Sequence, residues 1–321
     1  MRGGDAALLP DQNAVASIRY CPRQVKRVST TQEFLLDTGV FHSISFAECE
    51  RLQSGQGTFS AGLSVPFELI TGFEIEGSDA NLMSRHAAIR RYQQMIQISP
   101  GLIPEGVVEK SFGLPPTQGG ARLMELCVKI EEIDTPERLR RFLSNSSFFH
   151  KLKAGADRVS DLFVEAVKTA VTNYKTATKE GLAEFDLPRD HASFKNYVQH
   201  LNQFGDLTRC ALIALAERAG RDTSLPATGL YEASLQLETE LRSHYDGSLD
   251  VYIDAYVDFF VSKMDEGGSA HRNDSFDLDR LMYLRSADQA QKFVSTDKAL
   301  VLRVNRVREG RATELQAILK Q

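Results

Sequence analysis

Residues 269–300, SAHRNDSFDLDRLMYLRSADQAQKFVSTDKAL, decide the fold class, because a helical pattern is followed there by a strand pattern. Apolar residues recur at helical spacing from Leu278 to Leu284. A short β-rich run at 292–296 then leads to Asp297 and to a second helical pattern. This alternation predicts an α/β domain with Asp297 at the carboxyl end of a strand, the edge of a sheet where ligands and catalytic groups collect.

Acidic residues in three parts of the chain are candidates for one site. Asp274 and Asp277 stand three residues apart at the start of the helical pattern, and this spacing predicts that they share a face. The apolar run 34–39 predicts a buried strand that presents Asp37 at its tip. Glu68 stands among apolar residues, where carboxylates are seldom buried unless they are paired or bound to a metal. Gathered together, these acids would repel one another unless a divalent cation neutralised them.

Four short acidic segments follow one another along the chain. They are LLDT at 35–38, SVPFELITG at 64–72, NDSFDLDRLMYL at 273–284 and KFVSTDKAL at 292–300. In this order they resemble the four acidic motifs of PIN-domain nucleases. The resemblance implies a three-layer α/β fold, a parallel sheet flanked by helices, which a large all-α insertion interrupts here. It also implies a set of catalytic acids that hold Mg²⁺ or Mn²⁺, matched by Asp37, Glu68, Asp274 and Asp297, with Asp277 as a further metal ligand.

The activity that the resemblance implies is hydrolysis of phosphodiester bonds by metal-activated water, with RNA favoured over DNA as the substrate. Thr38 and either Thr296 or Ser295 are candidates to orient ligands or to bind the scissile phosphate. Arg303 and Arg306 belong to a basic cluster after the fourth motif and are candidates to contact the substrate. Homodimers are common among PIN-domain proteins, so a homodimer or a regulatory protein partner is also compatible with the resemblance.

Several alternatives stay open at the level of the sequence. Gly39 and Pro66 depart from the motif pattern and favour a non-catalytic PIN scaffold that binds nucleic acid or protein. LLDTG at 35–39 also looks like the aspartic protease motif, but that class needs a second copy or a homodimer in an all-β fold. The acids at the helix starts could instead cap those helices. Asp279 and Asp288 are assigned to the surface.

Composition excludes several classes of protein. A net charge of −5 over 321 residues argues against a surface coated with phosphate-binding groups, although local basic patches can hold nucleic acid. The four cysteines lack metal-ligand spacing, which favours reduced thiols in the cytoplasm. No apolar run is long enough to span a membrane, and the N-terminus lacks the form of a signal peptide, so no membrane partner is expected.

The chain divides into an expected tail at 1–28, a first α/β part at 29–103, a helical insertion at 104–248 and a second α/β part at 249–321. Helical patterns are expected at 44–52, 81–98, 121–133, 156–180, 190–203, 206–219, 228–244 and 249–265. A further helix is expected to start at Thr135 and Pro136, a cap candidate followed by proline at the first helical position. Between residues 138 and 158 basic residues stand among phenylalanines, a mixture that can contact phosphates and stack on unpaired bases. A solvated helix face with core phenylalanines is the competing interpretation.

Overall fold

The structure is a computed structural model that describes residues 32–320, except residues 56, 99–100, 185–189 and 225–228. The expected tail, residues 1–28, lies outside the described residues. The described residues all belong to one compact unit. None of the helices within them combines the length and the hydropathy that crossing a membrane requires.

A four-stranded parallel sheet organises the α/β part of the unit. The strands are β1 (Glu33–Leu36), β2 (Thr58–Ser60), β3 (Gln291–Ser295) and β4 (Ala312–Glu314), in the spatial order β2-β1-β3-β4. β1 and β3 pair with Leu36 opposite Val294, so their carboxyl ends meet at one edge although they are far apart in sequence. The α/β prediction and the two predicted strands are confirmed. β2 and β4 were not predicted, because three residues are too few to show alternation.

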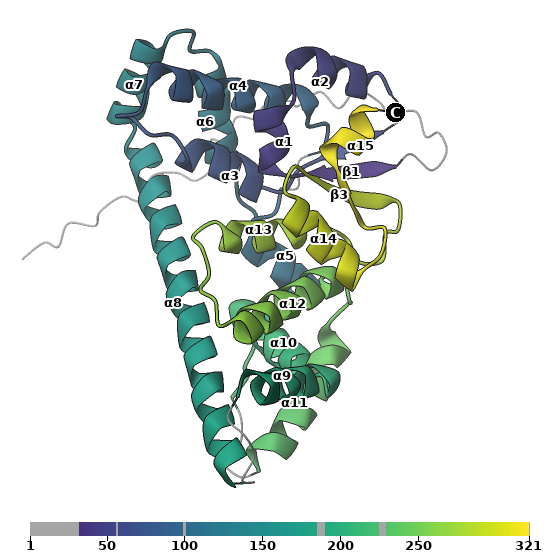
Figure 1. The fold of residues 1–321 in the computed structure, drawn as a ribbon. Coiled ribbons are helices and arrows are strands. Elements are labelled where there is room, and N and C mark those ends of the chain that lie inside the picture. Colours follow the sequence, from purple (N-terminus) through teal and green to yellow (C-terminus); the bar gives the residue numbers. More distant parts are fainter. Residues whose placement is uncertain (1–31, 56, 99–100, 185–189, 225–228, 321) are drawn as a thin grey trace, which may run out of the picture. The chain divides into compact units, whose positions relative to one another are not determined.

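Helices cover both faces of this sheet. Leu35 and Phe293 belong to one buried cluster, with residues of α12 (Asp250–Glu266) and α14 (Lys298–Val307). Leu36 and Val294 belong to a second cluster, with residues of α1 (Thr38–Ser43) and α4 (Asp79–Met95). Side chains alternate between the faces of a strand, and both faces are apolar here, as in parallel sheets that are covered on both sides. Figure 1 shows α1 and α4 on one side of the strands and α12 and α14 on the other.

The first α/β part contributes four helices, α1 (Thr38–Ser43), α2 (Phe46–Gln53), α3 (Ser64–Thr71) and α4 (Asp79–Met95). The predicted helices at 44–52 and 81–98 are confirmed as α2 and α4. Ser45 begins α2 in a capping box with Glu48, which explains why the helix starts there. Asp37 caps α1 by accepting a hydrogen bond from the Thr38 backbone N–H. Asp37 therefore both follows the end of β1 and begins α1.

Between residues 104 and 248 the described chain is helical, as predicted. The helices are α5 (Pro104–Ser111), α6 (Ala121–Glu131), α7 (Pro136–Asn145), α8 (Ser147–Glu184), α9 (His191–Gln203), α10 (Asp206–Arg218) and α11 (Leu230–His244). Thr135 caps α7 and Pro136 takes its first position, as the sequence indicates. With 38 residues, α8 is about 57 Å long and contacts α3, α12 and α13.

The last part of the chain adds α12 (Asp250–Glu266), α13 (Asp274–Leu281), α14 (Lys298–Val307) and α15 (Leu315–Leu319). α12 packs against α8, α9 and α10 as well as against α13 and α14. Buried residues of β1, α8, α10 and α12 therefore share one hydrophobic cluster. The helices of 104–248 are continuous with the core of the α/β part, and α12 is the element that joins them.

Candidate functional site

Three carboxylates from three elements converge on the guanidinium of Arg280, on α13. Nη1 of Arg280 donates hydrogen bonds to Oδ1 of Asp37 and to Oδ1 of Asp277, the latter at 2.8 Å. Nη2 donates to Oε2 of Glu68, on α3. Arg280 is 5% exposed and Asp37 is 3% exposed, so the interaction is largely removed from water. We call Arg280, Asp37, Glu68 and Asp277 the Arg280 cluster.

Two hydroxyl groups fix the acids of the Arg280 cluster. Ser295, the last residue of β3, donates from Oγ to Oδ2 of Asp37 at 2.6 Å. Thr38 donates from Oγ1 to Oε2 of Glu68 at 2.7 Å. Because Thr38 and Ser295 lie at the adjacent carboxyl ends of β1 and β3, the register of the sheet sets where both carboxylates point. Thr38 therefore orients one acid of the cluster.

The surroundings of Asp277 in the Arg280 cluster raise the pKa of its carboxyl group. Burial raises the pKa of Asp277 to about 7; Arg280 opposes this shift, and the negative charges of Asp37, Glu68 and Asp297 add to it. Burial alone would lower the pKa of Arg280, but the surrounding carboxylates raise it above its usual value. Three carboxylates thus share one guanidinium, and the like charges are compensated only in part.

The raised pKa of Asp277 predicts how stability depends on pH. The folded chain keeps this proton up to about pH 7, whereas the unfolded chain releases it near pH 3.8. Between these values the native state binds more protons, so this group makes the free energy of unfolding fall as pH rises, by on the order of 2–4 kcal/mol. We expect Asp277→Asn to remove this slope. Urea unfolding of both proteins across the window measures it, and parallel profiles would contradict the assignment.

Asp274, the third acid that the motif implies, lies outside the Arg280 cluster. Its Oδ2 accepts a hydrogen bond from the backbone N–H of His271 at 2.8 Å and lies 3.8 Å from Nζ of Lys263. Asp274 and Asp277 are thus directed at different partners. The residue that the structure brings to Asp37 and Glu68 is Asp277.

Asp297 follows β3, as predicted, and caps α14. Its Oδ1 accepts hydrogen bonds from the backbone N–H groups of Ala299, at 2.7 Å, and Leu300. The carboxylate is exposed, and its charge acts on Asp277 without a direct contact to Arg280. The capping interpretation therefore describes what Asp297 does in this structure, beside the cluster.

Two glycines of the motif segments are explained by close approaches. A Cβ at Gly39 would overlap Oγ1 of Thr296, so the substrate-binding candidate Thr296 lies over the start of α1. A Cβ at Gly72 would overlap the guanidinium of Arg85. Gly39 was a departure from the motif pattern, and the structure gives it a packing reason.

The two arginines predicted to contact the substrate lie between α14 and α12. Nε of Arg303 is 3.3 Å from Oδ2 of Asp258, and Nη1 of Arg306 is 3.0 Å from Oδ1 of the same residue. The guanidinium of Arg303 also lies over the ring of Phe259, 5.2 Å from its centroid. Both side chains thus have partners on α12, and the structure does not bring them to the Arg280 cluster.

Arg280 and the surroundings of Glu68 were not predicted from the sequence. Arg280 stands three residues after Asp277, a spacing that places them on one helix face, and this signal could have found it. A hollow of about 360 Å³ is lined by His42 of α1 and by residues of α4 that include Arg85, and Glu68 acts electrostatically on both of these side chains. Asp279, expected on the surface, is half-buried and 3.7 Å from Arg218.

The donors of the Arg280 cluster fit a hard divalent cation in their chemistry. Carboxylate oxygens are the ligands that Mg²⁺ and Mn²⁺ prefer, and the cluster has more negative than positive charge. The guanidinium of Arg280 lies among these oxygens, and in the described part of the chain no group of three or more His, Cys, Asp or Glu residues is arranged as a metal site. Comparison of the chain with protein-family models, with curated proteins and with solved structures gives no match.

Proposed function

We propose that this chain is a PIN-like nuclease that depends on Mg²⁺ or Mn²⁺ and hydrolyses phosphodiester bonds, with RNA favoured as the substrate. The observation that carries the proposal is the meeting of Asp37, Glu68 and Asp277 at the carboxyl edge of a parallel sheet. These acids come from segments that are far apart in sequence. Convergence of three acids in a buried site is costly, which points to function rather than to stability.

In this proposal Asp37, Glu68 and Asp277 would hold the metal, with the exposed Asp297 beside them. The metal would supply an activated water and stabilise the charge that develops on the leaving oxygen. Ser295 and Thr38 keep two of the carboxylates oriented through their hydroxyl groups. The guanidinium of Arg280 holds the acids together through hydrogen bonds to all three carboxylates.

Incubation with labelled single-stranded RNA and DNA, in Mn²⁺, Mg²⁺ or EDTA, tests the proposal. We expect cleavage that requires the metal and is faster on RNA. If the folded protein cleaves neither RNA nor DNA in Mn²⁺ or Mg²⁺, the proposed nuclease activity is contradicted.

A second function, a non-catalytic binding module on the same scaffold, is favoured by one observation. Arg280 already donates to all three carboxylates, and an internal cation of this kind can take the place of a metal. Calorimetric titration with Mn²⁺ separates the two functions. A nuclease gives a saturable heat that disappears in Asp37→Asn, whereas a binding module gives no metal-dependent heat.

A further inference from the structure

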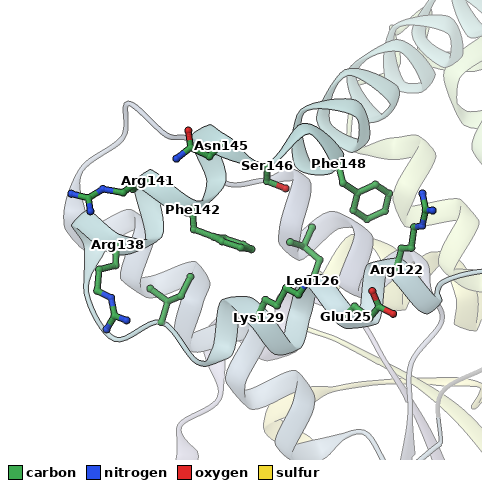
Figure 2. Close-up of a pocket in the computed structure, with 11 residues that line it drawn as sticks. Arg122, Glu125, Leu126, Lys129, Arg138, Arg141, Phe142, Asn145, Ser146 and Phe148 are labelled. Atoms are coloured by element: carbon green, nitrogen blue, oxygen red, sulfur yellow. The ribbon is translucent and has the colours of Figure 1, made fainter. Parts of the chain in front are cut away.

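A hollow of about 750 Å³ lies between α6, α7 and the first turn of α8 (Figure 2). Hollows of about 300–1,000 Å³ are typical of sites for small ligands, so this one can accept a nucleotide unit. Figure 2 shows the ring of Phe142 pointing into the hollow, with Arg138 and Arg141 on one side and Arg122 on the other. We define the basic groove by its cationic and aromatic lining residues, which are Arg122, Lys129, Arg138, Arg141, Phe142 and Phe148.

The charge of the basic groove is largely uncompensated. Glu125 is the acid among the lining residues, against four cations. Of these four cations, only Arg138 forms an ion pair with an acid in the described part of the chain. Its partner is Asp134, at 2.7 Å, and both of these side chains are well exposed. Exposed ion pairs of this kind are weak, so Arg138 can exchange its partner for a phosphate. The basic groove is therefore cationic although the chain as a whole is acidic.

The structure separates the basic groove from neighbouring cations that stabilise the fold. Arg140 donates to the carbonyl groups of Ile75 and Gly77, and Lys153 donates to those of Thr71 and Phe73, at the end of α3 and in the segment that follows it. These two side chains are occupied by backbone groups of the α/β part. The basic residues that remain turned to solvent around the hollow are the ones that an external anion can reach.

The two groove aromatics differ from the core phenylalanine beside them. Phe149 is fully buried, whereas Phe142 and Phe148 are half-buried and line the hollow. An aromatic face next to arginine and lysine is the combination that binds unpaired bases by stacking and the sugar-phosphate backbone by charge. Both rings pack in part against the hydrophobic core and also form part of the wall of the hollow.

We propose that the basic groove binds single-stranded RNA, with bases stacked on Phe142 and Phe148 and phosphates held by Arg122, Lys129 and Arg141. This extends the proposed function, because it assigns a holding site for the polymer outside the Arg280 cluster. A duplex hides the faces of its bases and an acidic peptide lacks them, so the two rings favour a single strand over both.

A second cleft connects the basic groove with the helices of the Arg280 cluster. It measures about 540 Å³ and shares Arg122 and Phe148 with the groove. Its other walls include Phe67 on α3 and Phe276 on α13, whose rings lie 6.0 Å apart. These residues directly precede Glu68 and Asp277 in sequence. The two depressions therefore share part of their walls, and the second one reaches the two helices that carry these acids.

The test is fluorescence anisotropy with a labelled single-stranded RNA of mixed sequence, in EDTA so that cleavage plays no part. We expect Phe148→Leu to weaken binding about tenfold, because one stacking surface is lost. The double variant Arg122→Gln/Arg141→Gln should lower the slope of log affinity against log salt concentration by about 1.4, because each phosphate contact to a single strand contributes about 0.7 to this slope. Arg158→Gln/Lys179→Gln is the matched control, because both residues are exposed on α8 and outside the groove.

Groove variants that lose affinity and salt slope while the control binds like the parent protein would support the proposal, even if no variant cleaves RNA. Equal losses in the groove and control variants would overturn it, since binding would then follow net charge alone. Equal affinity for a poly-glutamate peptide, unchanged by Phe148→Leu, would also overturn it and assign the groove to acidic proteins. Far-ultraviolet circular dichroism of each variant establishes that it is folded.

Discussion

Replacing Arg280 with methionine is expected to lower the free energy of unfolding at neutral pH by about 3–5 kcal/mol, because breaking a buried ion pair leaves uncompensated charge. Methionine keeps most of the apolar stem but donates nothing to Asp37, Glu68 and Asp277. Chemical denaturation at neutral pH measures the loss. The variant should recover stability at acidic pH, where the freed carboxylates become protonated.

Arg285→Met is the matched control for this experiment. Arg285 lies five residues further along the chain and pairs with Glu33 and Asp288, but its side chain is 55% exposed. An exposed pair contributes less than about 1 kcal/mol, so the control should unfold almost as the parent protein does. Equal losses for the two variants would show that burial of Arg280 does not matter.

The same variant also tests the metal. Once the guanidinium is gone, the three carboxylates have no internal cation, and Mn²⁺ should raise Tm more in Arg280→Met than in the parent protein, because binding to the native state alone stabilises it. Asp37→Asn in the Arg280→Met background should abolish the increase. If Mn²⁺ has no effect on Arg280→Met, the cluster does not hold a metal and the nuclease proposal fails.

Asp277→Asn is expected to lower the rate of metal-dependent cleavage by at least about a hundredfold. Residues that only support metal ligands typically cost about 10–100-fold when they are replaced, and a ligand should cost no less. Asparagine keeps the shape of the side chain, so the fold is retained. Initial rates on labelled single-stranded RNA in saturating Mn²⁺ measure the effect.

Asp274→Asn is the matched comparison, since it makes the same chemical change three residues earlier on α13. Asp274 contacts Lys263 and the backbone of His271, outside the Arg280 cluster, so this variant should keep most of the cleavage rate. If Asp274→Asn loses activity and Asp277→Asn keeps it, the third acid is the one that the motif implies. Loss of cleavage in both variants would mean that each substitution disturbs the position of α13 as a whole.

Much of the secondary structure could be predicted from local signals. Apolar periodicity located α4, α6 and the helices from α8 to α12, and the cap at Thr135 fixed the start of α7. The strands that end at Leu36 and Ser295 were visible as apolar runs before an acid. β2 and β4 were missed, because the hydrogen bonds that define them come from neighbouring strands rather than from their own residues.

The candidate site was predictable in its acids but not in its arrangement. The motifs identified Asp37 and Glu68, which meet as expected at the carboxyl edge of the sheet. Which of Asp274 and Asp277 joins them depends on how α13 is rotated about its axis, and packing against α3 and α12 decides that. Arg280 was not predicted although Asp277 stands three residues before it on the same helix, because its other two partners, Asp37 and Glu68, come from elements that are distant in sequence.

The short outer strands of the sheet also bear on how copies of the chain can associate. An outer strand exposes unpaired backbone groups that can template pairing with another copy of the chain. Here β2 and β4 are three residues each, and Ser60 of β2 also forms a parallel bridge with Ile98. Within the described residues the sheet thus offers few backbone groups for intermolecular strand pairing. The short outer strands therefore limit the backbone surface through which copies of this chain could pair as in amyloid.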